Sequence, residues 1–470
     1  MRKIRIFLPI ILIIIGSGII LFQRNHLEKR ESQSSNLFEN DPKTEYFGIY
    51  LKGYKVGYLA SRVDSTKDGY RVYSTTYMKL SPIGGMEKEV TYKIVANADF
   101  SYNLKDFEFS MFSDNYLFEA IGKRERNNLI VEFTSGGVKR KIIYEIKSSY
   151  LPATIEGLVK TGKIGNFKFF DPTLPSSDSL FDISVSVTGK DTIDGIPVIK
   201  YVVKQSGIDV LFWVTEKGEL LRSESPIGLL MKREKGLIKK DIKPVGFKLY
   251  DSYAIRVEKE IKNPREISFL KVRLDSVPLS GLRIEDDRQT LNGNILTIKK
   301  IQPGSSSLIP EEVKEFLKPS PFIPSDDERI KTIAKEVVGD KRGLEAVERI
   351  ISYVDKKLED KPTFSIPDPI EALNSGEGDC NEHAALAVAL LQASGIPARV
   401  EVGLVYINGA FYYHAWVGAY LGGKWVSSDP VFGQVIADPT HIKLEYGGFE
   451  SQAKLYRVIN KLQITVLDYD

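Results

Sequence analysis

The sequence predicts a multidomain protein with an N-terminal transmembrane helix, a large antiparallel β domain, a small β-sandwich-like domain and a C-terminal α+β core. Three observations predict it: an uncharged apolar stretch near the N-terminus, a long series of strand-like segments separated by turn residues, and amphipathic helices followed by strands. A chain of 470 residues, 42% apolar and 27% charged, is typical of several folded domains. The expected segments are 1–24 (transmembrane helix), 25–45 (tether), 46–245 (antiparallel β domain), 246–302 (small β domain), 303–324 (proline-rich linker) and 325–470 (core).

The apolar stretch at residues 6–22 contains no charge, and Arg2, Lys3 and Arg5 precede it. A helix of that length spans roughly 25 Å, which bilayers accommodate. No Ala-x-Ala cleavage pattern follows, so we expect an uncleaved signal anchor. The short N-terminal tail favours a single-pass membrane protein with the bulk of the chain outside the cytoplasm.

The antiparallel β domain is predicted by turn signals that recur along the chain, such as Ser-Gly-Gly at 135–137. Residues 247–301 are again rich in strand formers and predict the small β domain. Five prolines between Pro303 and Pro324 mark the linker.

Helices are expected at the start of the core. The first has the apolar stripe Ile330, Ile333, Ala334, Val337 and Val338. The second has the stripe Leu344, Val347, Ile351, Val354 and Leu358. A third, alanine- and leucine-rich segment at 381–394 ends at a Gly-Ile-Pro sequence, as a buried helix would. We expect the first two helices to pack beside the third.

Cys380 is the only cysteine of the chain, so it cannot form an internal disulfide. Asp379 stands where an N-cap residue belongs, which places Cys380 in the first turn of the third helix. Backbone N–H groups and the helix dipole favour an anion at that position, so we expect the pKa of Cys380 to fall below that of a free thiol.

Three strands are expected downstream, at 398–407, 411–420 and 424–429, joined by Asn-Gly and Gly-Gly turns. A two-residue loop at Gly422-Gly423 sets Trp416 opposite Asp429, so that His414 and Asp429 share one face as diagonal neighbours. The sequence therefore predicts a thiol site in which His414 and Asp429 serve Cys380.

Each of these residues also has a simpler interpretation. A lone buried cysteine is commonly an inert small hydrophobe, His414 alone fits a core histidine, and Asp429 alone fits a turn former before a proline. Their joint placement favours the thiol site. His383, one turn from Cys380, competes for the role of base but cannot reach Asp429 through the hairpin. Trp416 and Trp425 are interpreted as core aromatics.

Three strings of the core resemble the transglutaminase-like superfamily, a papain-type fold of cysteine acyltransferases and hydrolases: GEGDCNEHAALAVALLQASGIPARVEVGLVY, FYYHAWVGAYLGGKWVSSDPVFGQ and ADPTHIKL. The resemblance implies that Cys380 is the nucleophile, that His414 is the general base and acid, and that Asp429 orients His414. Asp438 and His441 also match members of this group, and we interpret them as structural closure of the site. The opening FGIYLKGYKVGY resembles N-terminal β domains that accompany such cores in envelope proteins, which implies a curved half-barrel.

Together with the expected N-terminal anchor, the resemblance implies a membrane-anchored, extracytoplasmic thiol enzyme that acts on peptide or glutamine-type amides, with hydrolysis favoured over amine transfer. The expected partners are a protein or peptide substrate in the envelope and the membrane. The sequence shows no paired-cysteine zinc module and no acidic calcium loop, so no cofactor or metal is expected. A net charge of +3, without basic stretches interleaved with aromatics, gives no sign of nucleic-acid binding. The alternative is a catalytically silent core that recognises an envelope protein or polymer.

Overall fold

The computed structural model describes residues 41–470 with gaps at 52, 81–87, 114–115, 147–148, 152–158, 160–161, 173–179, 206–207, 227, 237–240, 243–253, 307, 362–366, 448–453, 456–457 and 460. The chain divides into two compact units, one ending at Phe247 and the other running from Lys248 to Asp470. The expected anchor at 1–24 and most of the tether at 25–45 lie outside the described residues. Among the helices that are described, none combines the length and apolar character needed to cross a membrane.

The first unit is a 14-stranded sheet in which every neighbouring pair is antiparallel, in the order β8-β7-β6-β5-β4-β3-β2-β1-β14-β13-β12-β11-β10-β9. Its strands are β1 Glu45–Leu51, β2 Tyr54–Thr66, β3 Gly69–Leu80, β4 Lys88–Ala98, β5 Leu104–Ser113, β6 Tyr116–Glu125, β7 Asn128–Ser135, β8 Val138–Glu145, β9 Gly165–Phe170, β10 Leu180–Ile193, β11 Ile196–Gln205, β12 Ile208–Thr215, β13 Leu220–Glu224 and β14 Leu229–Glu234. The predicted antiparallel β domain is confirmed.

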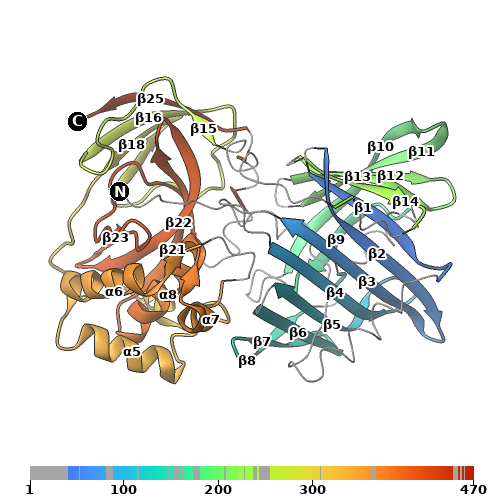
Figure 1. Ribbon diagram of the computed structural model, residues 1–470, viewed down its shortest axis with the longest axis horizontal. Coiled ribbons are helices and arrows are strands. Elements are labelled where there is room, and N and C mark those ends of the chain that lie inside the picture. Colours follow the sequence, from blue (N-terminus) through green and yellow to red (C-terminus); the bar gives the residue numbers. More distant parts are fainter. Residues whose placement is uncertain are drawn as a thin grey trace. The chain divides into compact units, whose positions relative to one another are not determined.

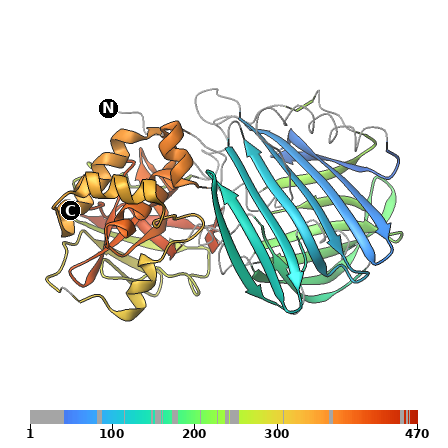
Figure 2. The ribbon, with the colours of Figure 1, turned by 90° about the horizontal axis from the view of Figure 1, so that it is seen from below.

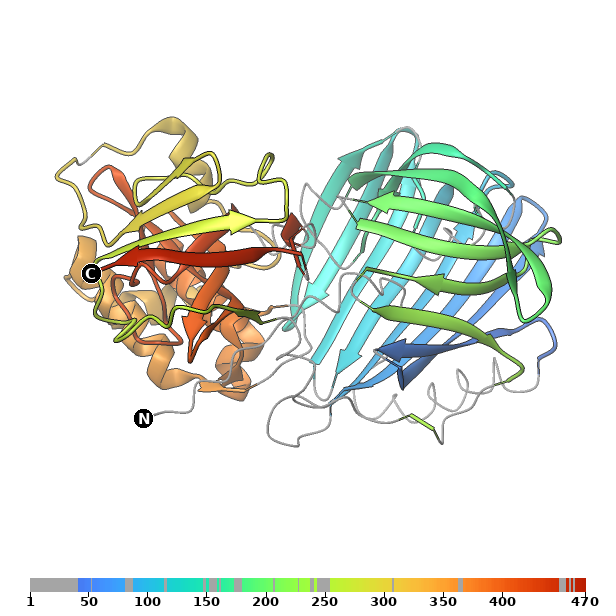
Figure 3. The same cartoon turned by 90° about the horizontal axis from the view of Figure 1, so that it is seen from above.

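This sheet curves over on itself, so that β10–β13 lie over β3–β6 in opposite views of the unit (Figures 2 and 3). Alternating side chains of β4 are buried, as expected for a strand with one face on a core. Aromatic rings from distant strands meet there: Phe107 of β5 lies 5.4 Å from Phe170 of β9, and Tyr144 of β8 lies 5.0 Å from the same ring. The enclosed face is therefore packed by side chains.

The second unit contains the predicted α+β core. Its helices are α4 Glu311–Lys314, α5 Glu328–Val338, α6 Gly343–Lys357, α7 Pro369–Ser375 and α8 Cys380–Ala393, with a short 3₁₀ helix η4 at Glu315–Leu317. Its five-stranded sheet consists of β15 Ile255–Arg256, β21 Ala398–Ile407, β22 Ala410–Leu421, β23 Lys424–Ser428 and β24 Ile442–Gly447. A parallel pair, β19 Glu359–Asp360 with β20 Glu377–Gly378, precedes α8.

The core is layered, with the helices on one side of β21 and β22 (Figure 1). α8 is the central helix, since it packs on α5, α6, α7 and the sheet. Almost all of its side chains are therefore buried. The predicted stripes of α5 and α6 face it: Ile330, Ala334 and Val338 are buried on α5, and Val347 and Ile351 on α6. This arrangement agrees with the expected packing of the first two helices beside the third.

The structure differs from the expected small β domain at 246–302. β16 Phe269–Asp275, β17 Gln289–Asn292 and β18 Ile295–Lys299 form a four-stranded sheet whose fourth member is β25 Gln463–Tyr469, from the end of the chain. β15 pairs instead with β22 of the core. This sheet therefore belongs to one compact unit with the core, because pairing partners far apart in sequence complete it.

The proline-rich segment at 303–324 is also part of this unit. The Phe316 ring packs edge-on against Trp425 at 5.1 Å, and Ser306 N–H donates to the Gly422 carbonyl oxygen. The expected linker is therefore docked on the core along these contacts.

Candidate active site

The start of α8 is fixed by a reciprocal capping box. The Asp379 side chain accepts a hydrogen bond from Asn381 N–H at 2.8 Å, and Glu382 Oε2 accepts from Asp379 N–H at 3.0 Å. These bonds satisfy backbone donors that a helix N-terminus leaves open. Cys380 is consequently the first residue of the helix, as the sequence predicts.

The predicted hairpins carry the other two residues. Gly422 and Gly423 have φ of 62° and 90°, the left-handed conformations that a tight two-residue turn requires. Val417 pairs with Ser428 and Leu421 with Lys424, so the predicted register is confirmed. Asp429 follows β23 directly.

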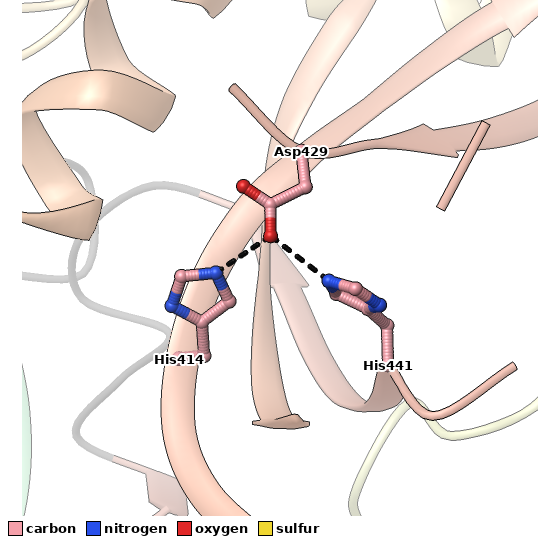
Figure 4. Close-up of side chains that lie close together, drawn as sticks. All are labelled: His414, Asp429 and His441. Carbon is pink, nitrogen blue, oxygen red and sulfur yellow. Dashed lines mark hydrogen bonds and ion pairs between the residues drawn. The ribbon is translucent and has the colours of Figure 1, made fainter. Parts of the chain in front are cut away.

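His414 and Asp429 are hydrogen bonded, with His414 Nε2 at 2.8 Å from Asp429 Oδ2, and both side chains are fully buried (Figure 4). Burial acts to raise the pKa of Asp429, but the charges and hydrogen bonds of His414 and His441 outweigh it and hold that pKa below its usual range. An ionised carboxylate can only accept, so His414 Nε2 carries the hydrogen. Among the residues that the structure describes, nothing hydrogen-bonds to His414 Nδ1, the other ring nitrogen.

Cys380 lies beside the part of β22 that carries His414. The backbone N–H of Ala415, the residue after His414, donates to the sulfur. The structure thus brings the three predicted site residues to one place: a helix start, a strand and the end of the next strand.

The expected low pKa of Cys380 is wrong. Burial raises the pKa of this thiol, the charge of Asp379 raises it further, and the Ala415 N–H offsets them only in part. The helix N-terminus favours the thiolate, but complete burial and the acidic capping residues that build the same helix start act in the opposite direction.

Residues 331–430 match the family described as the transglutaminase-like superfamily. The chain therefore contains a transglutaminase-like core at residues 331–430. The matched segment contains Cys380, His414 and Asp429, and it supports a thiol enzyme as the general class. No curated protein matches the sequence.

Solved structures show weaker likenesses. A Cytophaga hutchinsonii protein provisionally described as a cysteine protease is 17% identical, with 43% of this chain and 86% of that chain covered and a TM-score of 0.30. A β-barrel-like protein of a domain of unknown function from Brucella abortus is 14% identical, with 41% and 94% covered and a TM-score of 0.32. The periplasmic domain of TgpA from Pseudomonas aeruginosa is 16% identical, with 39% and 84% covered and a TM-score of 0.27.

The transglutaminase-like core holds a second histidine that the sequence argument assigned only to structural closure. His441 Nε2 lies 2.9 Å from Asp429 Oδ2, the oxygen that also bonds His414 (Figure 4). His441 and its neighbour Asp438 lie in the loop before β24 and beyond the matched segment. The Asp-Pro-Thr-His string marked them as notable, but no periodicity of strand or helix could predict a contact across that loop.

Other candidates of the sequence argument have structural partners. The His383 ring is hydrogen bonded through Nδ1 to the Asp379 carbonyl oxygen at 2.7 Å, within its own helix. Trp416 is fully buried and donates from Nε1 to Glu401 at 3.0 Å. Its ring lies 6.0 Å from that of His414 and 5.3 Å from that of His441, so Trp416 forms one wall of the site.

One donor atom each from His414, Asp429 and His441 lies within 4.8 Å of the others. In the present arrangement both histidines turn Nε2 to Asp429 Oδ2. A nitrogen that donates its hydrogen there offers no lone pair to a metal. In this arrangement the Asp429 carboxylate accepts a hydrogen bond from each of the two histidines.

Proposed function

We propose that this protein is a membrane-anchored, extracytoplasmic thiol enzyme that hydrolyses peptide or glutamine-type amide bonds in an envelope substrate. The observation that carries the proposal is the buried His414–Asp429 hydrogen bond beside Cys380, which leaves His414 Nδ1 available for a proton. The superfamily match over these residues supports the same assignment.

In the proposed reaction the Cys380 thiol gives its proton to His414 Nδ1 as the sulfur attacks the carbonyl carbon. The C–N bond then breaks, and the amine or ammonia leaves with that proton. Water attacks the thioester, again giving a proton to His414, and the carboxylic acid leaves as the thiol forms again. The Cys380 backbone N–H, in the first turn of α8, is our candidate donor to the oxyanion.

The raised pKa of Cys380 defines how this site would work. A thiol that is protonated at rest needs His414 as a general base during attack, rather than as a partner in a standing ion pair. A thiol that stays protonated is also consistent with the alternative function, a catalytically silent module that binds an envelope protein or polymer.

Turnover distinguishes these functions. The full chain is incubated with a blocked glutaminyl-glycine peptide and a panel of longer peptides, with and without a primary amine, and compared with Cys380→Ser. Ammonia release or peptide cleavage without incorporation of the amine supports hydrolysis, and incorporation supports acyl transfer. Tight binding without turnover, equal in both proteins, would establish the silent module instead.

The anchor and the location have a separate test. Residues 6–22 form an uncharged apolar stretch, so the full chain should remain with membranes after a high-salt wash and should be digested by protease added from outside the cytoplasmic membrane. A version without residues 1–24 should be released. Protection from the external protease would contradict the proposed orientation.

A further inference from the structure

The two histidines on Asp429 differ in what their second ring nitrogen meets. His441 Nδ1 lies 3.3 Å from the Asp438 carbonyl oxygen and 3.5 Å from Asp438 Oδ2. Both of these atoms accept hydrogen bonds, as does Asp429 Oδ2 at the other nitrogen. A neutral imidazole carries one hydrogen and would leave one of its nitrogens facing acceptors with a lone pair. His414, in contrast, faces an acceptor at Nε2 alone.

Asp438 is itself held in place by residues that lie outside the segment that matches the superfamily. Its Oδ2 accepts from Arg265 Nη1 at 3.0 Å and from Gln434 Nε2 at 2.9 Å, and its Oδ1 accepts from Thr440 N–H at 2.8 Å. Arg288 donates to the carbonyl oxygens of Asp438 and His441. Arg265 and Arg288 come from the segment before the core, so that segment helps to fix the loop that presents His441.

We propose that His441 is a positioning residue of the active site: a doubly protonated ring, clamped between Asp429 and Asp438, that holds the Asp429 carboxylate on His414. This inference rests on the proposed function, because it assigns a role to a residue that serves the general base. The inference goes beyond the proposed function because it assigns a role to a second histidine and to the contacts that link this histidine through Asp438 to Arg265.

The charges are consistent with such a ring. Burial disfavours an imidazolium, but the charge of Asp438 and the hydrogen bonds to Asp429 and Asp438 outweigh it and raise the pKa of His441. The titratable and charged groups that face it are Asp429 after β23, His414 on β22 and Asp438 in its own loop, with Arg265 and Arg288 behind Asp438. The two carboxylates, Asp429 and Asp438, thus lie on either side of the His441 ring, and Arg265 binds Asp438 from its other side.

The consequence for the site is geometric. Asp429 Oδ2 is shared by two donors on different elements, so the carboxylate cannot rotate away from His414 without losing His441 as well. In metal sites, partners that orient a ligating side chain contribute about 10- to 100-fold to activity, and we expect an effect of the same size for His441.

The test uses Cys380 as its own reporter, since it is the only cysteine. Iodoacetamide alkylation of the full chain is followed by intact mass for the wild type, His441→Leu, His441→Gln and His414→Ala. Lys331→Gln, which removes a charge from the exposed face of α5, is the control. We expect His441→Leu to slow alkylation about 10- to 100-fold. His441→Gln, which can still donate to Asp429, should recover most of that loss, and the control should match the wild type.

Imidazole nitrogen NMR reads the protonation directly, because the chain has four histidines and each signal can be assigned by substitution. Both nitrogens of His441 should carry hydrogen at pH 7, and Asp438→Asn should lower the pH at which the second hydrogen is lost. A singly protonated His441 at pH 7, or wild-type alkylation in a folded His441→Leu, would overturn the inference. If His414→Ala also alkylates like the wild type, the proposed thiol site fails as well. If the His441 variants alkylate like the wild type but His414→Ala is slower, only the role of His441 is rejected and the proposed function stands.

Discussion

His441 Nε2 lies 2.9 Å from Asp429 Oδ2, so the carboxylate that serves the general base is held from two sides. This relationship makes Asp429 the residue on which most of the buried site depends.

Replacement of Asp429 by Asn should therefore remove activity without removing the thiol. The amide has no charge to stabilise the His414 imidazolium that forms during attack, and it offers one acceptor oxygen where the carboxylate offers two. We expect kcat to fall by roughly 10⁴-fold, as it does when the orienting Asp of a Ser-His-Asp triad is replaced by Asn. Steady-state kinetics with whichever amide the wild type turns over measure this, and a kcat within threefold of the wild type would contradict the role of Asp429.

Asp379 has two opposed effects on the site, and one substitution separates them. Its side chain caps α8, while its charge, which burial and the neighbouring Glu382 disfavour by raising the pKa of Asp379, raises the pKa of Cys380. Asn is as good an N-cap as Asp, so Asp379→Asn should keep the helix start and lower the pKa of the thiol. The pH at which iodoacetamide begins to react with Cys380 should then move down.

The matched variant Asp379→Ala removes the charge and the cap together, which costs about 1 kcal/mol of stability. Both variants should share the lower pH of alkylation, and only Asp379→Ala should melt earlier. An unchanged pH of alkylation in Asp379→Asn would show that the charge of Asp379 does not act on the sulfur.

The buried ring of His441 also makes stability depend on pH. Its pKa in the folded protein lies above the unfolded value of about 6.5, so folding takes up a proton there. The stabilisation is fully present below the unfolded pKa and is lost as the pH rises through the folded pKa. Urea unfolding, followed by tryptophan fluorescence, should show the wild type losing stability above about pH 6.5 and His441→Gln losing less. Equal losses in both proteins would assign this pH dependence to another group.

The Asp429 and Asp438 carboxyls make stability depend on pH in the opposite direction to His441. Burial acts to raise the pKa of each carboxyl. For Asp438, the charge and hydrogen bond of His441 and the charge of Arg265 outweigh burial and lower the pKa. For Asp429, His414 and His441 do the same. Their contribution is present above the unfolded value near 3.9 and disappears as the pH falls through the folded one. Acid unfolding of Asp438→Asn should accordingly be less steep than that of the wild type.

The docked proline-rich segment is tested at Phe316. This half-buried ring packs against Trp425 at 5.1 Å and Tyr446 at 6.2 Å. Because the side chain is only partly buried, Phe316→Ala should cost about 1 to 2 kcal/mol, less than a fully buried phenylalanine. Urea unfolding measures it, with Leu308→Ala as the exposed control from the same segment. A loss no greater than that of the control would show that the segment is not held by these rings.

Local patterns predicted the parts of the site that neighbours in sequence build. The Gly422-Gly423 turn set the register of β22 and β23, and Asp379 marked the start of α8, because turns and caps are specified by adjacent residues. These two features were sufficient to bring His414 and Asp429 together on one face. The long antiparallel sheet followed from the same kind of signal.

Long-range contacts were outside the reach of those patterns. The pairing of β16 with β25 joins segments almost 200 residues apart in sequence, and no turn between them indicates it. The contact of His441 with Asp429 depends on how a loop returns to β24. The raised pKa of Cys380 depends on complete burial, which an alanine-rich helix suggests for its own side chains but not for the thiol at its first position.

The measurement that tests the central claim most directly is trapping of an acyl group on the single cysteine. The full chain is mixed with a blocked glutaminyl-glycine peptide or a cleavable peptide, quenched in acid within one turnover, and analysed by intact mass. We predict one thioester adduct at Cys380 in the wild type and none in Cys380→Ser or His414→Ala. A wild-type chain that binds these amides yet never carries the adduct, or an equal adduct in His414→Ala, would contradict the account.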